Sequence, residues 1–224
     1  MTSTSTVQTF SLSHEVPIQE HISLVTDELL ASLPDPKQLS ADERRAIIAR
    51  YAQVLEGNFI YWMTGAYLAV ETEQARSIIL DNLQEEVRDC HPGMLRRFAI
   101  AAHAVPTDSD ALDVYRDLTN VRLFIGRLSA VPMVIMMAFF EGFIQRFMSF
   151  LAELAELQGS AEKEYTDVHG VCDVAHTQGL FQALSAEMSV HSPEPTTQPF
   201  EGVELLRTLL RTILGPGTVQ PLLT

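Results

Sequence analysis

Cysteine is scarce in this sequence, which contains only Cys90 and Cys172 among its 224 residues. Both lie in or beside stretches with helical periodicity, so they do not suggest a disulfide framework. Basic residues are also few, with 15 Lys and Arg against 29 Asp and Glu, a net charge of -14 and a pI near 4.8. A phosphate backbone needs a basic surface, so this balance argues against nucleic acid as a partner. It favours a cytoplasmic protein.

Long hydrophobic runs are missing too. The most apolar stretch, 131–144, contains an unbroken run from Met133 to Phe140, which is shorter than the ~18 residues of a membrane span. Glu141 interrupts its extension, so we expect no membrane span and instead a central helix of a bundle. Residues 1–13 lack a basic n-region and an apolar h-region, so we expect a flexible end there and another at 215–224.

Strand-like alternation, hairpin signals and repeats of fixed period are absent as well, and the sequence therefore predicts an all-α fold. Apolar residues recur at helical spacing, and a seven-helix bundle in a single domain, residues 1–224, is the expected way to bury them. Ser40 and Glu43 form a capping-box pattern, and an interruption is expected near Pro132. The predicted helices cover residues 14–33, 40–69, 71–89, 92–104, 111–157, 162–190 and 203–214, with a linker at 192–195.

Against this background, one stretch carries chemistry: His169, Asp173 and His176 stand at i, i+4 and i+7. On a helix these offsets place all three side chains on one face along two turns. Two imidazoles and a carboxylate can hold a divalent transition metal and leave coordination positions open. The alternative is a solvated polar face that carries two histidines by chance.

Glu141 follows the apolar run directly, between Phe140 and Phe143. A carboxylate in such surroundings is not buried unless it is paired, protonated or bound to a metal. The alternative is that Glu141 reaches the surface. We expect it to point inward.

Two adjacent glutamates end the third predicted helix, and the helical wheel separates them. Ile79, Leu80, Leu83 and Val87 define the apolar face of this helix. Glu86 lies on the flank of that face at roughly 100° per residue, whereas Glu85 lies on the far side, so Glu86 is expected inside and Glu85 in water. The choice stays open because Asp89 and Cys90 can unwind before His91-Pro92. His91 starts the next helix and can turn back toward the bundle.

The inward candidates together make a di-metal carboxylate site in a bundle. Ferritin-like di-iron proteins use two Glu-x-x-His motifs, and this chain contains none, so its architecture must differ. The candidate metal ligands are Glu86, His91, Glu141, His169, Asp173 and His176.

These elements in this order resemble the haem-oxygenase-like di-iron oxidases and oxygenases. The likeness lies in the glutamates at 85–86 with His91-Pro92, the isolated Glu141, and His169-x3-Asp173-x2-His176, and it spans about residues 47–188. The group includes the Chlamydia protein associating with death domains and the fatty-acid decarboxylase that makes 1-undecene. The resemblance implies a haem-oxygenase-like fold without haem, two Fe(II) ions, O2 as cosubstrate and a small-molecule substrate in specialised biosynthesis.

Under that resemblance, the substrate is an amine, an amino acid or a fatty acid, and the reaction is N-oxygenation or oxidative C–C cleavage. We assign Glu86, His91 and His176 to the first iron and His169 and Asp173 to the second, with Glu141 bridging or shared. The residues that could line a substrate pocket are Tyr51, Phe59, Trp62, Met137 and Phe140, and for each the alternative is ordinary core.

Two other classes of function remain open at this stage. One is a non-catalytic helical interaction module, which has no need for a carboxylate after an unbroken apolar run. The other is a thiaminase-like enzyme with a cysteine nucleophile, for which Cys172 is the candidate, although no third group is evident to orient a Cys–His pair. A homodimer is one expectation for the assembly.

Overall fold

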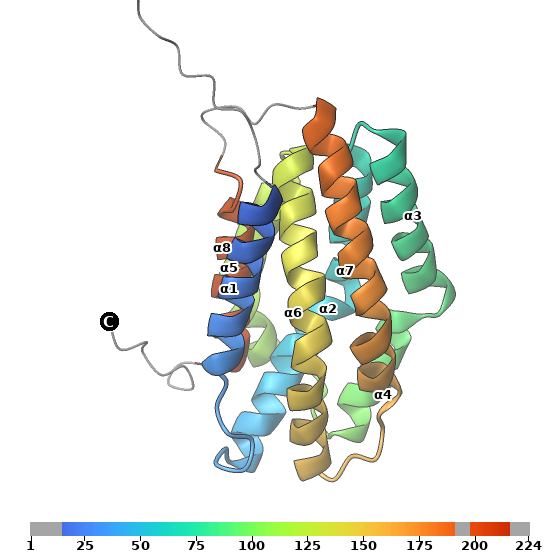
Figure 1. Cartoon of the computed structure of the whole chain (residues 1–224). Coiled ribbons are helices and arrows are strands. Elements are labelled where there is room, and N and C mark those ends of the chain that lie inside the picture. The colour runs from blue at the N-terminus through green and yellow to red at the C-terminus, as the bar shows by residue number, and fades with distance from the viewer. Residues whose placement is uncertain (1–14, 191–197, 216–224) are drawn as a thin grey trace, which may run out of the picture.

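Eight α-helices make up the described part of the chain, residues 15–190 and 198–215 of a computed structural model (Figure 1). No strand occurs in these residues, and the all-α prediction is confirmed. The expected end at 1–13, all of the expected end at 215–224 except Gly215, and the expected linker at 192–195 lie outside the described residues. The helices are α1 (Glu15–Ala31), α2 (Ala41–Ala69), α3 (Glu73–Arg88), α4 (His91–Ala101), α5 (Asp108–Ile125), α6 (Ala130–Leu157), α7 (Glu164–Val190) and α8 (Glu201–Leu214).

The prediction of seven helices was wrong by one because the segment 111–157 forms two helices. α5 ends at Ile125 and α6 begins at Ala130. Leu128 between them has φ 51°, a left-handed conformation that no α-helix can continue through. Pro132 lies inside the first turn of α6, where its missing N–H leaves no intrahelical hydrogen bond unmade. The interruption therefore precedes the proline by a few residues.

The predicted capping box at the start of α2 is confirmed. The Glu43 carboxylate accepts a hydrogen bond from the Ser40 backbone N–H at 2.7 Å, and the Ser40 hydroxyl accepts one from the Glu43 N–H at 3.3 Å. Each bond satisfies a backbone donor that the first helical turn leaves free. α2, which contributes one wall of the site described below, therefore begins at a defined residue.

α6 lies at the centre of the bundle, with α1 on one side and α7 on the other (Figure 1). Every residue from Met133 to Phe140 is buried. By length and composition alone, α6 is the one described helix apolar enough to cross a membrane, but 78% of its most apolar window is buried inside the bundle. A core helix passes the same test, and the expectation of no membrane span stays a prediction.

α3 packs against α7 in antiparallel orientation, and contacts along their length fix the register. Near one end, the Glu187 carboxylate on α7 accepts a hydrogen bond from the Thr72 N–H just before α3 at 2.8 Å. In the middle, a Cβ on Gly179 would lie 3.0 Å from Ile78 Cγ2, so the two helices approach closely there. This register decides which side chains of α3 face which side chains of α7.

The packing of α8 provides a test of the fold that is independent of any metal. A Cβ at Gly202 would lie 2.7 Å from Phe124 Cε1 and 2.8 Å from Met136 Cβ, closer than real Cβ atoms approach. We expect Gly202→Ala to lower the free energy of unfolding by about 1–3 kcal/mol through overpacking. Gly57→Ala is the matched control, because nothing lies within 4 Å of its Cβ. That change inside α2 should raise the same free energy by about 0.5–1 kcal/mol.

Urea unfolding of the metal-free variants measures both changes. A Gly202→Ala variant as stable as the unchanged protein would mean that α8 does not pack as closely as described.

Candidate metal centre

The buried face of α7 carries the three predicted side chains of this helix. His169, Asp173 and His176 are buried, and Tyr165 and Leu180 continue the same face at helical spacing. Asp173 is only 1% exposed. The alternative of a solvated polar face is therefore wrong for these residues. The i, i+4, i+7 pattern aims all three into the bundle.

Glu141 faces α7 from the centre of α6 and is 3% exposed. Its Oε2 lies 3.8 Å from His176 Nδ1, and its Oε1 has no hydrogen-bond partner. The next residue, Gly142, would place a Cβ 3.5 Å from Thr177 Cγ2, so α6 and α7 are in contact at this level. The alternative in which Glu141 reaches the surface is wrong.

A tight turn between α3 and α4 brings Glu86 and His91 together. α3 ends at Arg88, Cys90 adopts a left-handed φ of 57°, and α4 begins at His91 with Pro92 in its first turn. His91 Nδ1 consequently lies 2.7 Å from Glu86 Oε1, and both side chains are buried. The unwound turn thus brings two residues five positions apart into contact.

The structure brings all six predicted side chains together as two groups. Within each group, the nitrogen and oxygen atoms that could bind a metal lie within 4.8 Å of one another. The first group contains Glu86, His91 and His169, and the second group contains Glu141, Asp173 and His176.

This grouping exchanges the two α7 histidines relative to the sequence-based assignment. His169 lies near the start of α7, where α4 also begins, so its ring packs 4.5 Å from that of His91. Its Nε2 is 4.0 Å from Glu86 Oε1. His176 lies two turns further along α7 and meets Glu141 on α6 instead. The spacing along α7 gave no information about which neighbouring helix each histidine would meet.

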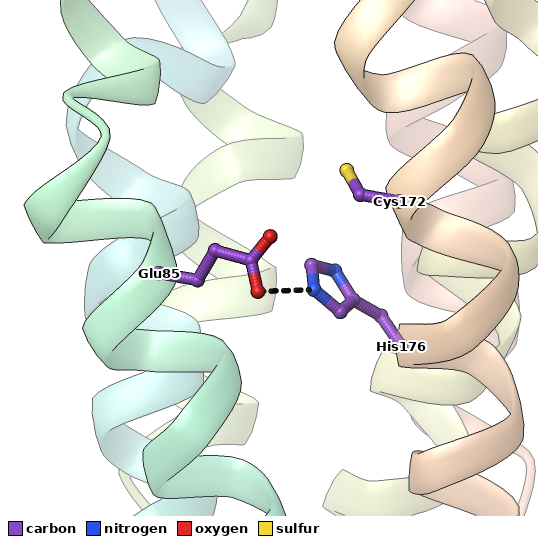
Figure 2. Close-up of side chains that lie close together, drawn as sticks. All are labelled: Glu85, Cys172 and His176. Carbon is purple, nitrogen blue, oxygen red and sulfur yellow. Dashed lines mark hydrogen bonds and ion pairs between the residues drawn. The ribbon is translucent and has the colours of Figure 1, made fainter.

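Neighbouring acceptors orient both α7 histidines. His169 donates from Nδ1 to the Tyr165 carbonyl oxygen at 2.8 Å, which leaves Nε2 facing Glu86. His176 Nε2 lies 3.4 Å from Glu85 Oε2 (Figure 2), while its Nδ1 lies 3.7 Å from Asp173 Oδ1. Metal-binding histidines characteristically donate their second N–H to a carbonyl or carboxylate, which fixes the tautomer and the ring.

The prediction that Glu85 points into water is correct only in part. Its side chain is 36% exposed and its carboxylate points at His176. The predicted face of α3 was misjudged: Val87 is 59% exposed, and the buried face consists of Ala75, Ile79, Asn82 and Glu86. The pairing of Glu86 with His91 and His169 accounts for this rotation, because a buried carboxylate must find polar partners. Glu86 then occupies the centre of the buried face.

The second group has polar atoms that nothing in the described residues satisfies. Glu141 Oε1, Asp173 Oδ2 and His176 Nδ1 are buried and have no hydrogen-bond partner. An unpaired buried polar atom costs about 1–3 kcal/mol, and such atoms are rare in native proteins. A divalent cation between them would satisfy all three, so the residues fit a metal.

The pKa values of the second group also fit a site for a metal ion. Burial raises the pKa of Glu141, and burial and the charge of Glu141 raise the pKa of Asp173 to about 9. Burial lowers the pKa of His176, but the neighbouring Glu141 outweighs it and the pKa reaches about 9. Without a metal, protons therefore compensate the buried carboxylates at neutral pH. In the first group, burial lowers the pKa of His169 to about 4, so this imidazole is neutral and ready to bind.

Both groups face one cavity of about 380 Å³, a volume that includes its open mouth. Its lining is mainly apolar away from the two groups, and it contains neither Lys nor Arg. The lining residues are Leu55, Phe59, Glu86, His91, Pro92, Leu95, Phe140, Glu141, Ile144, Tyr165, His169 and Asp173.

Two of the five predicted pocket residues, Phe59 and Phe140, are among these lining residues. Tyr51, Trp62 and Met137 are instead fully buried in the core and do not line the cavity. The Trp62 ring packs edge-on against Phe140 at 5.2 Å.

Several residues of the site escaped the sequence analysis. Tyr165 lines the cavity, and its hydroxyl shares a 2.8 Å hydrogen bond with that of Tyr51. Its position four residues before His169 places it on the same helical face and could have identified it. Leu55 and Leu95 lie four residues from the predicted Phe59 and His91, so the same helical spacing could have identified them too.

The two adjacent glutamates give the first test of the site. We expect Glu86→Gln to weaken Fe(II) binding at the first group by more than about 100-fold, because it removes that group's only carboxylate. Glu85→Gln should weaken Fe(II) binding by less than about tenfold, since the amide oxygen can still accept from His176 Nε2. Anaerobic titration of both variants measures the affinities, and equal losses would contradict the division of roles.

The raised pKa values of Asp173 and His176 make a second prediction. A metal must displace the protons on this group, whose pKa values lie at about 9. Affinity for Fe(II) should therefore rise with pH up to about 9, by up to about tenfold per pH unit for each proton released, and then level off. Calorimetry in buffers of different ionisation enthalpy counts the protons. Binding that is independent of pH between 6.5 and 9 would show that the group holds no such protons.

Comparison with known proteins agrees with this geometry. The family model of iron-containing redox enzymes matches residues 47–209, a range that contains all six candidate ligands. No curated protein matches the chain. Because the match covers well over half of the sequence, the chain belongs to the haem-oxygenase-like family of iron-containing redox enzymes.

Proposed function

We propose that the protein is an O2-dependent non-haem di-iron oxygenase or oxidase that oxidises a small molecule. The observation that carries this proposal is the pair of buried carboxylate–imidazole groups that open onto one cavity. Two Fe(II) ions bound there would supply the electrons for O2 activation, for which the mixed nitrogen and oxygen ligands are suited. The family match supports the iron and the redox chemistry.

The charges of the two groups support a pair of ions better than a single one. Glu86 gives the first group one negative charge, and Glu141 and Asp173 give the second group two. Two divalent cations exceed these three charges by one, which leaves a net attraction for an anionic ligand. The buried carboxylates are thereby compensated without any Lys or Arg in the lining.

The protein's own residues hold the ligands in place and keep bulk water out. The Tyr165 carbonyl and the Glu85 carboxylate fix the rings of His169 and His176 from behind. Phe59 and Phe140, which both line the cavity, pack at 5.7 Å between ring centroids and form an apolar part of its wall. This wall excludes water from the space in front of the two groups.

The cavity also limits how a substrate can bind. Since neither Lys nor Arg lines it, a substrate carboxylate has only the bound ions as counter-charge. The rest of the substrate faces aliphatic and aromatic side chains, including Leu55, Leu95 and Ile144. We propose an amine, an amino acid or a fatty acid whose polar end faces the ions and whose apolar part occupies this side of the cavity.

The geometry does not favour a cysteine-nucleophile enzyme. Cys172 Sγ donates a hydrogen bond to Asp173 Oδ1 at 3.2 Å, and burial and this carboxylate raise the pKa of the thiol. A reactive cysteine needs the opposite environment, one that stabilises the thiolate. Cys172 is therefore held as a thiol in the metal-free protein.

Metal content tests the proposal directly. We expect anaerobically loaded protein to bind two Fe(II) per chain and to change its absorption spectrum on mixing with O2. Glu141→Gln should reduce the stoichiometry to one and abolish the spectral change. It should not unfold the protein, because removal of a buried charge without its metal is often neutral or stabilising.

Glu153→Gln is the control, because Glu153 lies on the same helix with a side chain that is 41% exposed. It should bind two ions as the unchanged protein does. Stoichiometry near zero at neutral pH with excess iron would overturn the proposal. Two ions bound by Glu141→Gln, with only a lower melting temperature, would make Glu141 a structural residue.

A further inference from the structure

A third group of possible metal ligands lies outside the two groups already described. Cys172 and His176 are one turn apart on α7, and Glu85 faces them from α3 (Figure 2). The carboxylate oxygen, the thiol sulfur and the imidazole nitrogen all lie within 4.8 Å of one another. Spacing of i and i+4 on one helix places a thiol and an imidazole on one face, where both can bind the same ion.

We call Glu85, Cys172 and His176 the outer group and the first and second groups the inner groups. The outer group uses the opposite side of the His176 ring from the second group. His176 Nε2 faces Glu85 Oε2 at 3.4 Å, whereas Nδ1 faces Glu141 at 3.8 Å and Asp173 at 3.7 Å. A neutral imidazole has one nitrogen free to bind a metal, because the other carries the proton. An ion on Nε2 therefore displaces the proton from that nitrogen and leaves the proton on Nδ1, which then cannot bind an ion in the second group.

The outer group differs from the inner groups in ligand chemistry. Both inner groups offer only imidazole nitrogen and carboxylate oxygen. Cys172 adds a sulfur, and thiolate ligands select thiophilic cations such as Zn²⁺ and Cd²⁺. A thiolate and the Glu85 carboxylate together balance the charge of one divalent cation, and a fourth, tetrahedral position remains for water.

The outer group is also the more accessible one. The Glu85 side chain is 36% exposed and Cys172 is partly buried, whereas Glu141 and Asp173 are almost fully buried. An ion that arrives from solution on this side reaches Glu85 and Cys172 without displacing core side chains.

We propose that Glu85, Cys172 and His176 form a separate site for a thiophilic divalent cation. This site competes with the second group for His176. The bound cation displaces two protons, the Cys172 thiol proton that forms the hydrogen bond to Asp173 in the metal-free protein and the proton on His176 Nε2, and both protons leave to solvent. A cation in this site withdraws one ligand from the second group and so opposes its occupation.

Cadmium titration of the reduced, metal-free full-length chain tests the site without any iron. We expect one tightly bound Cd²⁺ per chain and a thiolate-to-cadmium charge-transfer absorption in the ultraviolet. Cys172→Ser should abolish the absorption, and Glu85→Gln should weaken the binding by at least about tenfold. Cys90→Ser is the matched control, because Cys90 is exposed and lies at the α3–α4 turn. It should leave the absorption intact.

X-ray absorption at the cadmium edge of the unchanged protein gives a measurement that does not depend on a variant's folding. We expect one sulfur ligand on the bound Cd²⁺, with nitrogen and oxygen as the other ligands. Ultraviolet absorption that survives in Cys172→Ser, absorption that is lost in Cys90→Ser, unchanged affinity in Glu85→Gln, or a cadmium shell without sulfur would each overturn the proposed site.

The competition between the outer site and the second group for His176 rests on the proposed di-iron function. A separate experiment tests it. Addition of Cd²⁺ to iron-loaded protein should release one Fe(II) per chain and leave the other bound. If Cd²⁺ binds as above but both irons stay, the competition is wrong while the outer site stands. If the protein never binds two irons, the proposed function fails, and the cadmium experiments still decide the outer site.

Discussion

The burial of carboxylates among aromatic and aliphatic side chains is the constraint on which the rest of the structure depends. Glu141 follows nine consecutive buried residues of α6 and is itself buried. A charge in such a medium is stable only beside an opposite charge, a proton or a metal. The histidines of α4 and α7 lie beside these carboxylates. Each carboxylate has an imidazole nitrogen within 4.8 Å, close enough for one metal ion to bind both. The bundle is arranged around this requirement.

Features of the site that depend on local spacing could be predicted from the sequence. The offsets of His169, Asp173 and His176 are properties of one helix, and the flanking phenylalanines of Glu141 mark it as buried. The histidine partners could not be predicted, because they depend on the register of α7 against α3, α4 and α6. The rotation of α3 was missed for a related reason. Val87 suggested an apolar face by its type, but long-range contacts of Glu86 decide which side of α3 is buried.

The two adjacent glutamates of α3 contact different histidines of α7. Consecutive residues point roughly 100° apart around a helix. Glu86 consequently reaches His91 and His169 in the interior, while Glu85 approaches His176 from the partly exposed side. The sequence analysis treated the two residues as rivals for one metal. In the structure they address different histidines, so the presence of both has a physical reason.

The left-handed turn at Cys90 has a consequence for how the site assembles as the chain folds. Glu86 and His91 are only five positions apart, so their contact closes a very short loop and loses little chain entropy. His169 comes from a distant part of the sequence and joins them only when α7 docks. Two of the three ligands of the first group thus form a local structure, whereas the second group, from α6 and α7, depends on long-range packing. A nascent chain can therefore offer a carboxylate–imidazole pair to a passing metal ion before the bundle that will enclose it exists.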